Sequence, residues 1–297
     1  MLTIFSTPKP FKGHIGIIQR NAITSWTLIK PRPEIILFGS DAGTAEVARE
    51  LGVRHESEIA TNQYGTPLLN DLFLRAETYS QSQTMCYVNT DILLFSRFKR
   101  GVDQVSNQLR KFLVVSQRIN IDVTEQITFE DGWETRLGEQ ARNRGTSGQH
   151  TAIDVFAFPR GTYSQIPDFG IGRLWFDQWL IKAAREKGIP VVDLSPVAPV
   201  LHQNHDYGHV SGGADWIWKG EEAKHNLLLY GGVEHACTLL DVTHELRDTG
   251  NLKRVPFRRL RFNLWKWTIH NTFPLRRRLG LRRKADLPAQ PRTGRIG

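Results

Sequence analysis

The sequence predicts an α/β protein with a mainly parallel, mixed sheet and helices on both faces. Over the first 250 of 297 residues, short runs rich in β-branched and aromatic residues alternate with amphipathic helical patterns. The connections between most of these runs are short, which is typical of a parallel sheet with crossover helices. Hydrophobic residues make up 40% of the chain and charged residues 23%, so the composition excludes wholesale disorder and fibrous repeats.

The expected elements follow from local patterns and their stop signals. Pro31 closes the first helical pattern, and Thr66 followed by Pro67 opens the third, with Thr as N-cap and Pro in the first turn. Gly188 ends the fourth pattern. Strands are expected at 2–6, 34–39, 53–55, 85–88, 112–116, 151–158 and 189–193. Helices are expected at 17–30, 44–51, 67–80 and 174–187.

The pattern loosens over residues 118–149, where Gly, Arg, Asn and Thr accumulate. We expect a long loop there. Long loops in α/β domains commonly face the substrate.

Charge divides the chain into two parts. Residues 251–297 contain 14 Lys and Arg against one acid, Asp286, and carry +13, whereas residues 1–250 carry −4, which together give the net charge of +9. The sequence therefore predicts a mildly acidic domain over residues 1–248 and a basic amphipathic, partly disordered tail over residues 249–297.

Several protein classes are excluded by missing features. The two cysteines, Cys86 and Cys237, cannot form a disulfide framework or a four-cysteine zinc site. No phosphate-binding P-loop, dinucleotide-binding G-x-G-x-x-G or esterase G-x-S-x-G motif is present. The first residues do not have the pattern of a signal peptide, and no run is long and apolar enough to span a membrane, so we expect a cytoplasmic protein.

The segment CYVNTDILL carries the first chemical signal. Asn89, Thr90 and Asp91 directly follow the apolar run at 85–88, at the end of an expected strand. α/β folds bind ligands at this end of their sheet strands. Asp91 together with diphosphate oxygens can hold Mg²⁺ or Mn²⁺. A turn-capping role for the aspartate is the alternative.

The segment IGRLWFDQWL places Asp177 in the first turn of a helix that is entered through a glycine-rich loop. There its carboxylate can accept a proton from an attacking hydroxyl. The alternative is an N-terminal acid favoured by the helix dipole.

The segment LHQNHDYGH offers His202, His205 and His209. Neutral imidazoles can bind a cation that is held by phosphate, and a closed zinc site of the three histidines is a second interpretation. Hydrogen bonding within a polar loop is the third.

Taken in order, these pieces resemble GT-A-type glycosyltransferases, in particular a group of small nucleotide-diphospho-sugar transferase-like proteins. The resemblance spans about residues 1–248 and rests on the motifs FSTPKPF, FGSD, YGTPLLN, NTD, TAIDVFAFPRG, WFDQWL and LHQNHDY. It implies a metal-assisted transfer of a sugar from a nucleoside-diphosphate donor to an acceptor hydroxyl, with Mn²⁺ or Mg²⁺ as cofactor. We expect a glycan acceptor or, if the tail attaches to a membrane as predicted below, a lipid-linked one.

The resemblance also implies residue roles. Asn89 stands where the family's usual Asp-x-Asp motif has its first acid, and takes the ribose-facing role. Asp91 takes the metal, with His202 or alternatively His205. Asp177 is the catalytic base, which implies inversion at the anomeric carbon, and Asp154 faces the sugar hydroxyls. The alternative is a retaining enzyme that uses the same metal site without a base.

Four further residues are candidates for the donor pocket. Ser6, Thr7 and Asp41 follow the first two strands, and Arg20 on the first helix can pair with a phosphate or a base carbonyl. Turn residues and a surface arginine are the alternative.

Two rival functions remain open. An inactive GT-A-fold module that binds glycans or partners is favoured by Asn89 in place of an acid. A sugar-phosphate nucleotidyltransferase is disfavoured, because STPKPFKGH stands where such enzymes have a glycine-rich loop.

We predict that the tail attaches the protein to the inner face of a membrane, as suits an enzyme of polysaccharide biosynthesis. A helix starting at Pro256 has Phe257, Leu260, Leu264 and Trp267 on one side and basic residues on the other, the pattern of interfacial helices. Packing onto the domain is the main rival, and nucleic-acid binding is the weaker one. The full chain should co-sediment with anionic vesicles and a chain ending at Gly250 should not; equal behaviour of the two contradicts the prediction.

Overall fold

The computed structural model describes residues 1–206, 217–232 and 236–264. Their α-helices are α1 (Gly13–Thr27), α2 (Thr44–Leu51), α3 (Leu69–Tyr79), α4 (Ser96–Gln108), α5 (Trp133–Arg144), α6 (Phe176–Glu186) and α8 (Glu221–Tyr230). The strands are β1 (Leu2–Ser6), β2 (Glu34–Phe38), β3 (Arg54–Glu56), β4 (Thr84–Val88), β5 (Ile92–Leu93), β6 (Leu113–Ile121), β7 (Thr146–Ser147), β8 (Ile153–Pro159), β9 (Val191–Asp193), β10 (Val200–Gln203), β11 (His244–Leu246) and β12 (Leu252–Arg254).

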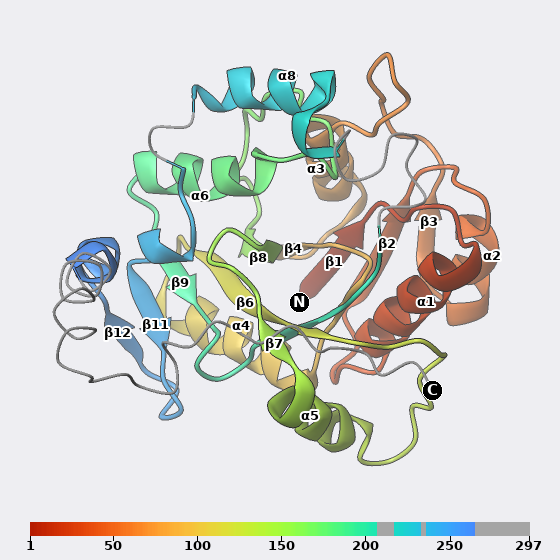
Figure 1. Ribbon diagram of the computed structural model, residues 1–297, viewed down its shortest axis with the longest axis horizontal. Helices are drawn as coiled ribbons and strands as arrows, with labels where there is room; N and C mark the ends of the chain where they lie inside the picture. The colour runs from red at the N-terminus through yellow and green to blue at the C-terminus, as the bar shows by residue number, and fades with distance from the viewer. Residues whose placement is uncertain (207–216, 233–235, 265–297) are drawn as a thin grey trace, which may run out of the picture. The chain divides into compact units, whose positions relative to one another are not determined.

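The strands form one mixed sheet in the order β12-β11-β9-β6-β8-β4-β1-β2-β3. β1 to β4 pair in parallel around β1, and β6, β9 and β11 pair in parallel on the other side. β8 lies between β4 and β6 and is antiparallel to both. The predicted mixed α/β fold with a mainly parallel sheet is therefore confirmed (Figure 1).

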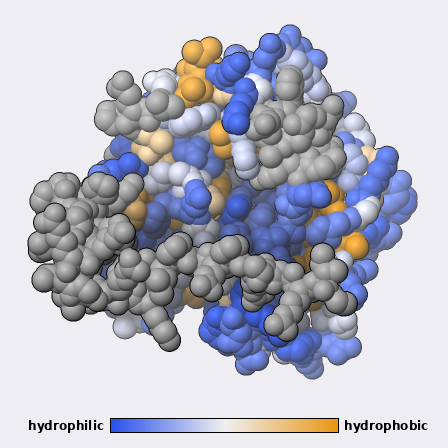
Figure 2. Space-filling view, in the orientation of Figure 1, coloured by the Kyte–Doolittle hydropathy of each residue, from blue (hydrophilic) through white to orange (hydrophobic). Residues whose placement is uncertain are grey.

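Helices cover both faces of this sheet, as predicted. One hydrophobic core joins one face to α1, α2 and α4. A second core joins the other face to α3, α6 and α8, which lie together at the top of Figure 1. On the described part of the face shown in Figure 2, hydrophobic residues form small separate patches in a mainly hydrophilic surface.

A cluster of aromatic rings fills the second core beneath the carboxyl ends of β1 and β4. Phe73 on α3 is at its centre, with ring centroids 5.1 Å from Phe5, 5.8 Å from Tyr87 and 5.4 Å from Phe158. Edge-to-face and offset ring pairs of this kind add to the stabilisation from burial. The cluster therefore supports Tyr87, whose hydroxyl reaches the candidate site described below.

The expectation of a long loop over 118–149 is wrong for much of its length. β6 continues to Ile121, and α5 occupies Trp133–Arg144. α5 is polar along most of its sequence, but its Leu137 and Ala141 pack in a third small core with Phe95 and Leu201. Because that apolar stripe is narrow, its packing rather than its local pattern stabilises the helix. α4 and α8 were also not predicted.

The end of the chain forms a separate unit. The chain divides into two compact units, Met1–Pro256 and Phe257–Gly297. The first unit runs past residue 248 because β12 pairs antiparallel with β11. A truncation after Pro256 therefore keeps the sheet intact and suits the vesicle experiment better than one after Gly250. Residues 258–264 are helical, and Phe257, Leu260 and Leu264 are exposed; Trp267 lies outside the described residues.

The aromatic cluster leads to a stability prediction with a neighbouring control. Phe73 is 2% exposed and Leu74 is 67% exposed. Phe73→Ala should lower the free energy of unfolding by about 3–5 kcal/mol, because it removes a large buried ring and leaves a cavity. Leu74→Ala should change it by no more than about 0.5 kcal/mol. Denaturant unfolding measures both, and equal effects would contradict this packing.

Candidate active site

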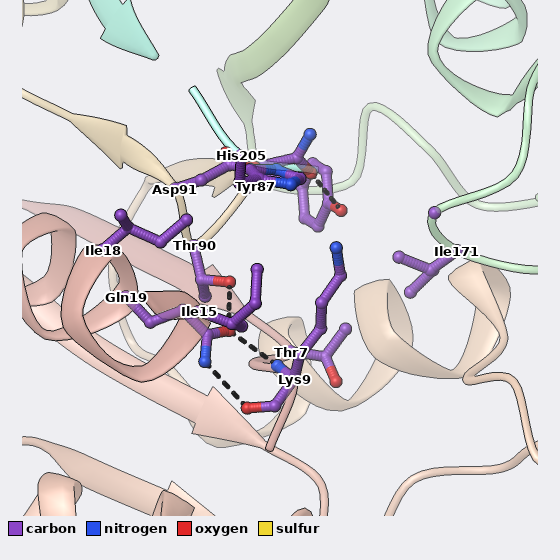
Figure 3. Close-up of a pocket in the computed structure, with 12 residues that line it drawn as sticks. Thr7, Lys9, Ile15, Ile18, Gln19, Tyr87, Thr90, Asp91, Ile171 and His205 are labelled. Carbon is purple, nitrogen blue, oxygen red and sulfur yellow. Dashed lines mark hydrogen bonds and ion pairs between the residues drawn. The ribbon is translucent and has the colours of Figure 1, made fainter. Parts of the chain in front are cut away.

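A pocket opens at the carboxyl ends of β1 and β4, beside the start of α1 (Figure 3). It encloses about 90 Å³. The described residues that line it are Thr7, Lys9, Ile15, Ile18, Gln19, Tyr87, Asn89, Thr90, Asp91, Ile171, Gly172 and His205. Apolar side chains from α1 and from the loop before α6 therefore enclose a polar centre, which is the usual composition of a small-molecule site.

Asp91, His202 and His205 form a compact group of metal-ligating side chains. Asp91 Oδ2 lies 3.1 Å from His205 Nε2 and 3.7 Å from His202 Nε2. One ligand atom from each of the three lies within 4.8 Å of the others. The sequence offered the two histidines as alternatives, whereas the structure brings both to Asp91. His209 lies outside the described residues.

Strand pairing brings these residues together. Asp91 directly precedes β5, and β10 pairs antiparallel with β5 so that His202 is the register partner of Ile92. β10 also pairs in parallel with β6, where His202 is opposite Asn120. The backbone N–H of Gln203 donates to the carbonyl of Asp91 at 3.2 Å. His202 thus has a defined position next to Asp91.

The electrostatics of the group favour a bound cation. Burial by itself raises the pKa of Asp91, but the neighbouring His202, His205 and Lys9 outweigh it and hold that pKa well below its usual range. Burial lowers the pKa of His202, so this imidazole is neutral and keeps a lone pair for coordination near neutral pH. The cluster therefore presents one carboxylate and at least one neutral imidazole.

The donor set fits a divalent cation. Asp91 Oδ1 and His202 Nδ1 are buried and have no hydrogen-bond partner among the described residues. Buried polar atoms are rarely left unpaired, so the unpaired Asp91 oxygen fits a place in the ligand set of a cation. One carboxylate with two imidazoles suits Mn²⁺ better than Mg²⁺, which prefers oxygen ligands. The same set can also hold Fe²⁺.

Asn89 belongs to a hydrogen-bonded network rather than to the cation group. Its Oδ1 accepts from the Tyr87 hydroxyl at 2.8 Å, and its Nδ2 donates to Asp154 Oδ1 at 2.8 Å. Asp154 is 7% exposed, and its other oxygen pairs with Arg118 Nη1 at 3.0 Å. An acid at position 89 would place two carboxylates in contact and raise the pKa of one of them. The amide at this position therefore has a structural reason.

Asp177 lies in the first turn of α6, as predicted. Burial raises its pKa to about 7, and the negative charge of Asp154 adds to this increase. Its Oδ1 is buried and finds no hydrogen-bond partner in the described part of the chain. A carboxylate with a pKa near neutrality is suited to accept a proton.

The backbone before Asp177 is unusual. Trp175 has φ of 87°, in the left-handed region that bulky residues avoid. Its ring packs 5.3 Å from that of Tyr230 on α8, which stabilises this conformation. Such outliers are concentrated at functional sites, because packing elsewhere must compensate for their strain.

The four predicted donor-pocket residues have different positions. Thr7 lines the pocket, and its buried Oγ1 has no partner among residues that the structure describes. Ser6 is buried beside it and its hydroxyl donates to the Val88 carbonyl. Arg20 and Asp41 do not line the pocket: Arg20 forms an ion pair with Glu50, and Asp41 is exposed.

Lys9 is a pocket residue that sequence reasoning missed. Its side chain extends into the pocket toward Tyr87 and His205 (Figure 3). Burial lowers its pKa, while Asp91 opposes that effect. The only signal in the sequence is its position in the turn after β1, within FSTPKPF.

Gln19 holds the Lys9 backbone in place. Its Oε1 accepts from Lys9 N at 2.7 Å and its Nε2 donates to Lys9 O at 2.8 Å. The Thr90 hydroxyl donates to the same Oε1 at 2.8 Å. Gln19 is 1% exposed and thereby connects the turn that carries Lys9 to the turn that carries Asp91.

Comparisons with known proteins give matches to solved structures. No protein-family model and no curated protein matches the sequence. Glucosyl-3-phosphoglycerate synthase from Mycobacterium tuberculosis, solved with Mg²⁺ and uridine diphosphate, is 15% identical; the match covers 79% of this chain and 80% of the synthase, with a TM-score of 0.45. The same synthase with phosphoglyceric acid is 17% identical over 79% and 81%, with a TM-score of 0.47.

A Desulfovibrio desulfuricans protein described as a nucleotide-diphospho-sugar transferase is 9% identical over 77% of this chain and 96% of its own, with a TM-score of 0.42. Two of the synthase structures contain Mg²⁺ or Mn²⁺ together with uridine diphosphate. At these identities and TM-scores the functional assignment rests on the residues of the pocket.

The pKa of Asp177 predicts a pH-dependent stability. The group's ordinary pKa is 3.8 and its pKa in the fold is about 7, so between these values the folded state binds more protons than the unfolded state. The free energy of unfolding therefore falls as pH rises through this window, by at most about 1.4 kcal/mol for each pH unit. In denaturant unfolding, the free energy of unfolding should fall less between pH 5 and pH 8 for Asp177→Asn than for wild type. Parallel profiles would show that Asp177 has an ordinary pKa.

Proposed function

We propose that the protein is a metal-assisted glycosyltransferase that moves a sugar from a nucleoside-diphosphate donor to an acceptor hydroxyl. One observation carries the proposal: Asp91, His202 and His205 lie together near the carboxyl ends of the sheet strands, and Asp91 and His205 line a pocket that also contains Lys9. A cation and the half-buried ammonium of Lys9 in one pocket match the two charges of a diphosphate. The position at the strand ends is where α/β sheets bind ligands.

Asp91, His202 and His205 hold the cation, which when bound offsets negative charge on the departing diphosphate. Lys9 adds a positive charge from the β1–α1 turn and binds diphosphate oxygens. The turn is rigid, because Gln19 bonds both backbone groups of Lys9. Lys9 therefore stabilises the leaving group without reorganisation during the reaction.

Asp177 accepts the proton. The acceptor oxygen attacks the anomeric carbon, the bond from that carbon to the diphosphate oxygen breaks, and the hydroxyl proton passes to the Asp177 carboxylate. A pKa of about 7 leaves a large fraction of Asp177 ionised at neutral pH while making it a stronger base than an ordinary aspartate. A base that deprotonates the acceptor for direct displacement of the diphosphate implies inversion at the anomeric carbon.

The inactive binding module remains the alternative from another class. Asn89 in place of an acid is the feature that favours such a module, but its hydrogen bonds with Tyr87 and Asp154 give the amide a structural reason. Thr7 and Asn89 line the pocket and are the remaining candidates for the nucleoside, with Asp154 for the sugar hydroxyls.

A glycan or lipid-linked acceptor, a role in polysaccharide biosynthesis and a peripheral membrane location remain part of the proposal. The exposed Phe257, Leu260 and Leu264 at the start of the tail are consistent with an interfacial helix. Within the described residues, no helix is long and apolar enough to cross a membrane.

The proposal predicts metal-dependent donor binding and transfer. In isothermal titration, UDP or GDP should bind, and Mn²⁺ should strengthen the binding. Lys9→Met should weaken nucleotide binding by about 10- to 100-fold, the effect of losing charge-assisted hydrogen bonds, while the exposed Lys12→Met should not. With a donor that turns over, Asp177→Asn should bind nucleotide as wild type does and lose about 10²- to 10⁴-fold in sugar release or transfer.

Each of these expected results has an outcome that would contradict it. Absence of UDP and GDP binding with and without Mn²⁺ would remove the donor site. Nucleotide binding without any sugar release or transfer, or unchanged turnover in Asp177→Asn, would favour the binding module. The exposed Glu139→Gln is the matched control for loss of a carboxylate.

A further inference from the structure

A second pocket lies on the other side of the loop that precedes α6. It encloses about 540 Å³ and is lined by three separate segments: the 61–68 connection before α3, Asp168, and the first half of α8. Its volume is sufficient for a mono- or disaccharide. None of the roles proposed above uses this pocket.

The floor of the pocket is rigid. Glu222 is 3% exposed and bonds Arg173 at 2.7 Å and Asn62 at 2.8 Å. Asn226 is 1% exposed; its side chain accepts from Gly170 N and donates to Gly170 O, each at 3.0 Å. These buried bonds fix the shape of the pocket before any ligand arrives, which lowers the entropic cost of binding.

The rim carries an exposed ring and groups with remaining acceptor capacity. Tyr64 is 43% exposed, and its hydroxyl donates to Glu221. The side chains of Asp168 and His225 are 58% and 55% exposed and lie 4.0 Å apart. A carboxylate accepts several hydrogen bonds, so these acids retain acceptor sites for hydroxyl donors. An aromatic ring beside polar side chains suits a sugar, because a sugar ring has an apolar face and hydroxyl groups at its edge.

The two pockets share a wall. Gly170 is held by Asn226 and borders the second pocket, and its neighbours Ile171 and Gly172 line the pocket that contains Lys9. The same segment leads directly into α6 and Asp177. A ligand in the second pocket therefore lies across one loop from the proposed site of transfer.

We propose that the second pocket is a subsite for the acceptor and binds a neutral or amino-bearing saccharide unit remote from the reacting hydroxyl. This rests on the proposed function. Three acids, Asp168, Glu221 and Glu222, line the pocket. Arg173 neutralises Glu222, and the other two repel an anionic sugar. The acceptor class is thus a glycan without uronic acid or phosphate groups at this unit.

Saturation-transfer NMR on the full chain tests the subsite with cellobiose, glucosamine and glucuronic acid as probes, with UDP and Mn²⁺ present to fill the first pocket. Cellobiose or glucosamine should bind, and glucuronic acid should bind about ten-fold more weakly or not at all. Tyr64→Ala should reduce saccharide binding by about ten-fold, the effect of one ring contact or hydrogen bond. Tyr64→Phe separates the ring from the hydroxyl, and Glu139→Gln is the control.

The proposal is overturned if neither cellobiose nor glucosamine binds, if Tyr64→Ala binds them as wild type does, or if glucuronic acid binds equally well. Titration of UDP with Mn²⁺ on the same variants distinguishes this failure from failure of the proposed function. Unchanged nucleotide binding with no saccharide binding removes only the subsite.

Discussion

The pairing of β10 with both β5 and β6 is the interaction on which the candidate site depends. It brings the Asp91 carboxylate to His205, 114 residues further along the chain, and to His202 between them. Asp91 is the last residue before β5, so a change in the register of this pairing would change which residues of β10 lie beside its carboxylate. Because successive strand residues face opposite sides, a shift of one residue would turn His202 away from the carboxylate.

Charge in the site is balanced over short distances. Asp91 is surrounded by two imidazoles and Lys9, and Asp154 is paired with Arg118 and with the amide of Asn89. The pKa of Asp177 is raised instead, because burial acts on this carboxylate and the negative charge of Asp154 adds to the effect. The same fold therefore keeps one aspartate ionised and another near neutrality, a separation that allows different chemical roles.

The loop over residues 169–173 links the candidate site to α8. The 61–68 connection and α8 hold it from one side through Gly170, Arg173 and the Asn226 amide, and the Lys9 pocket lies on its other side. Trp175 follows in a left-handed conformation that Tyr230 supports. The position of Asp177 thus depends on packing from α8, a helix that local sequence patterns did not reveal.

By itself, the sequence determined the alternation of strands and helices, the mixed α/β class, and the positions of Asn89, Asp91 and Asp177 at the ends or starts of elements. These features are local: a period of two or 3.6 residues and a capping residue can be recognised within a short window. Gly188, for example, ends a helical pattern as predicted, and its φ of 66° shows the left-handed conformation common at helix ends.

Only the tertiary structure decided which polar residues share a site. It joined both histidines to Asp91, added Lys9 and Gln19, placed Arg20 in a surface pair with Glu50, and showed Asp41 exposed. It also formed α5 where a loop was expected, through the packing of Leu137 and Ala141. These outcomes depend on contacts between residues that are far apart in the sequence. Such contacts produce no periodic pattern of apolar residues in a short window, so local sequence analysis cannot detect them.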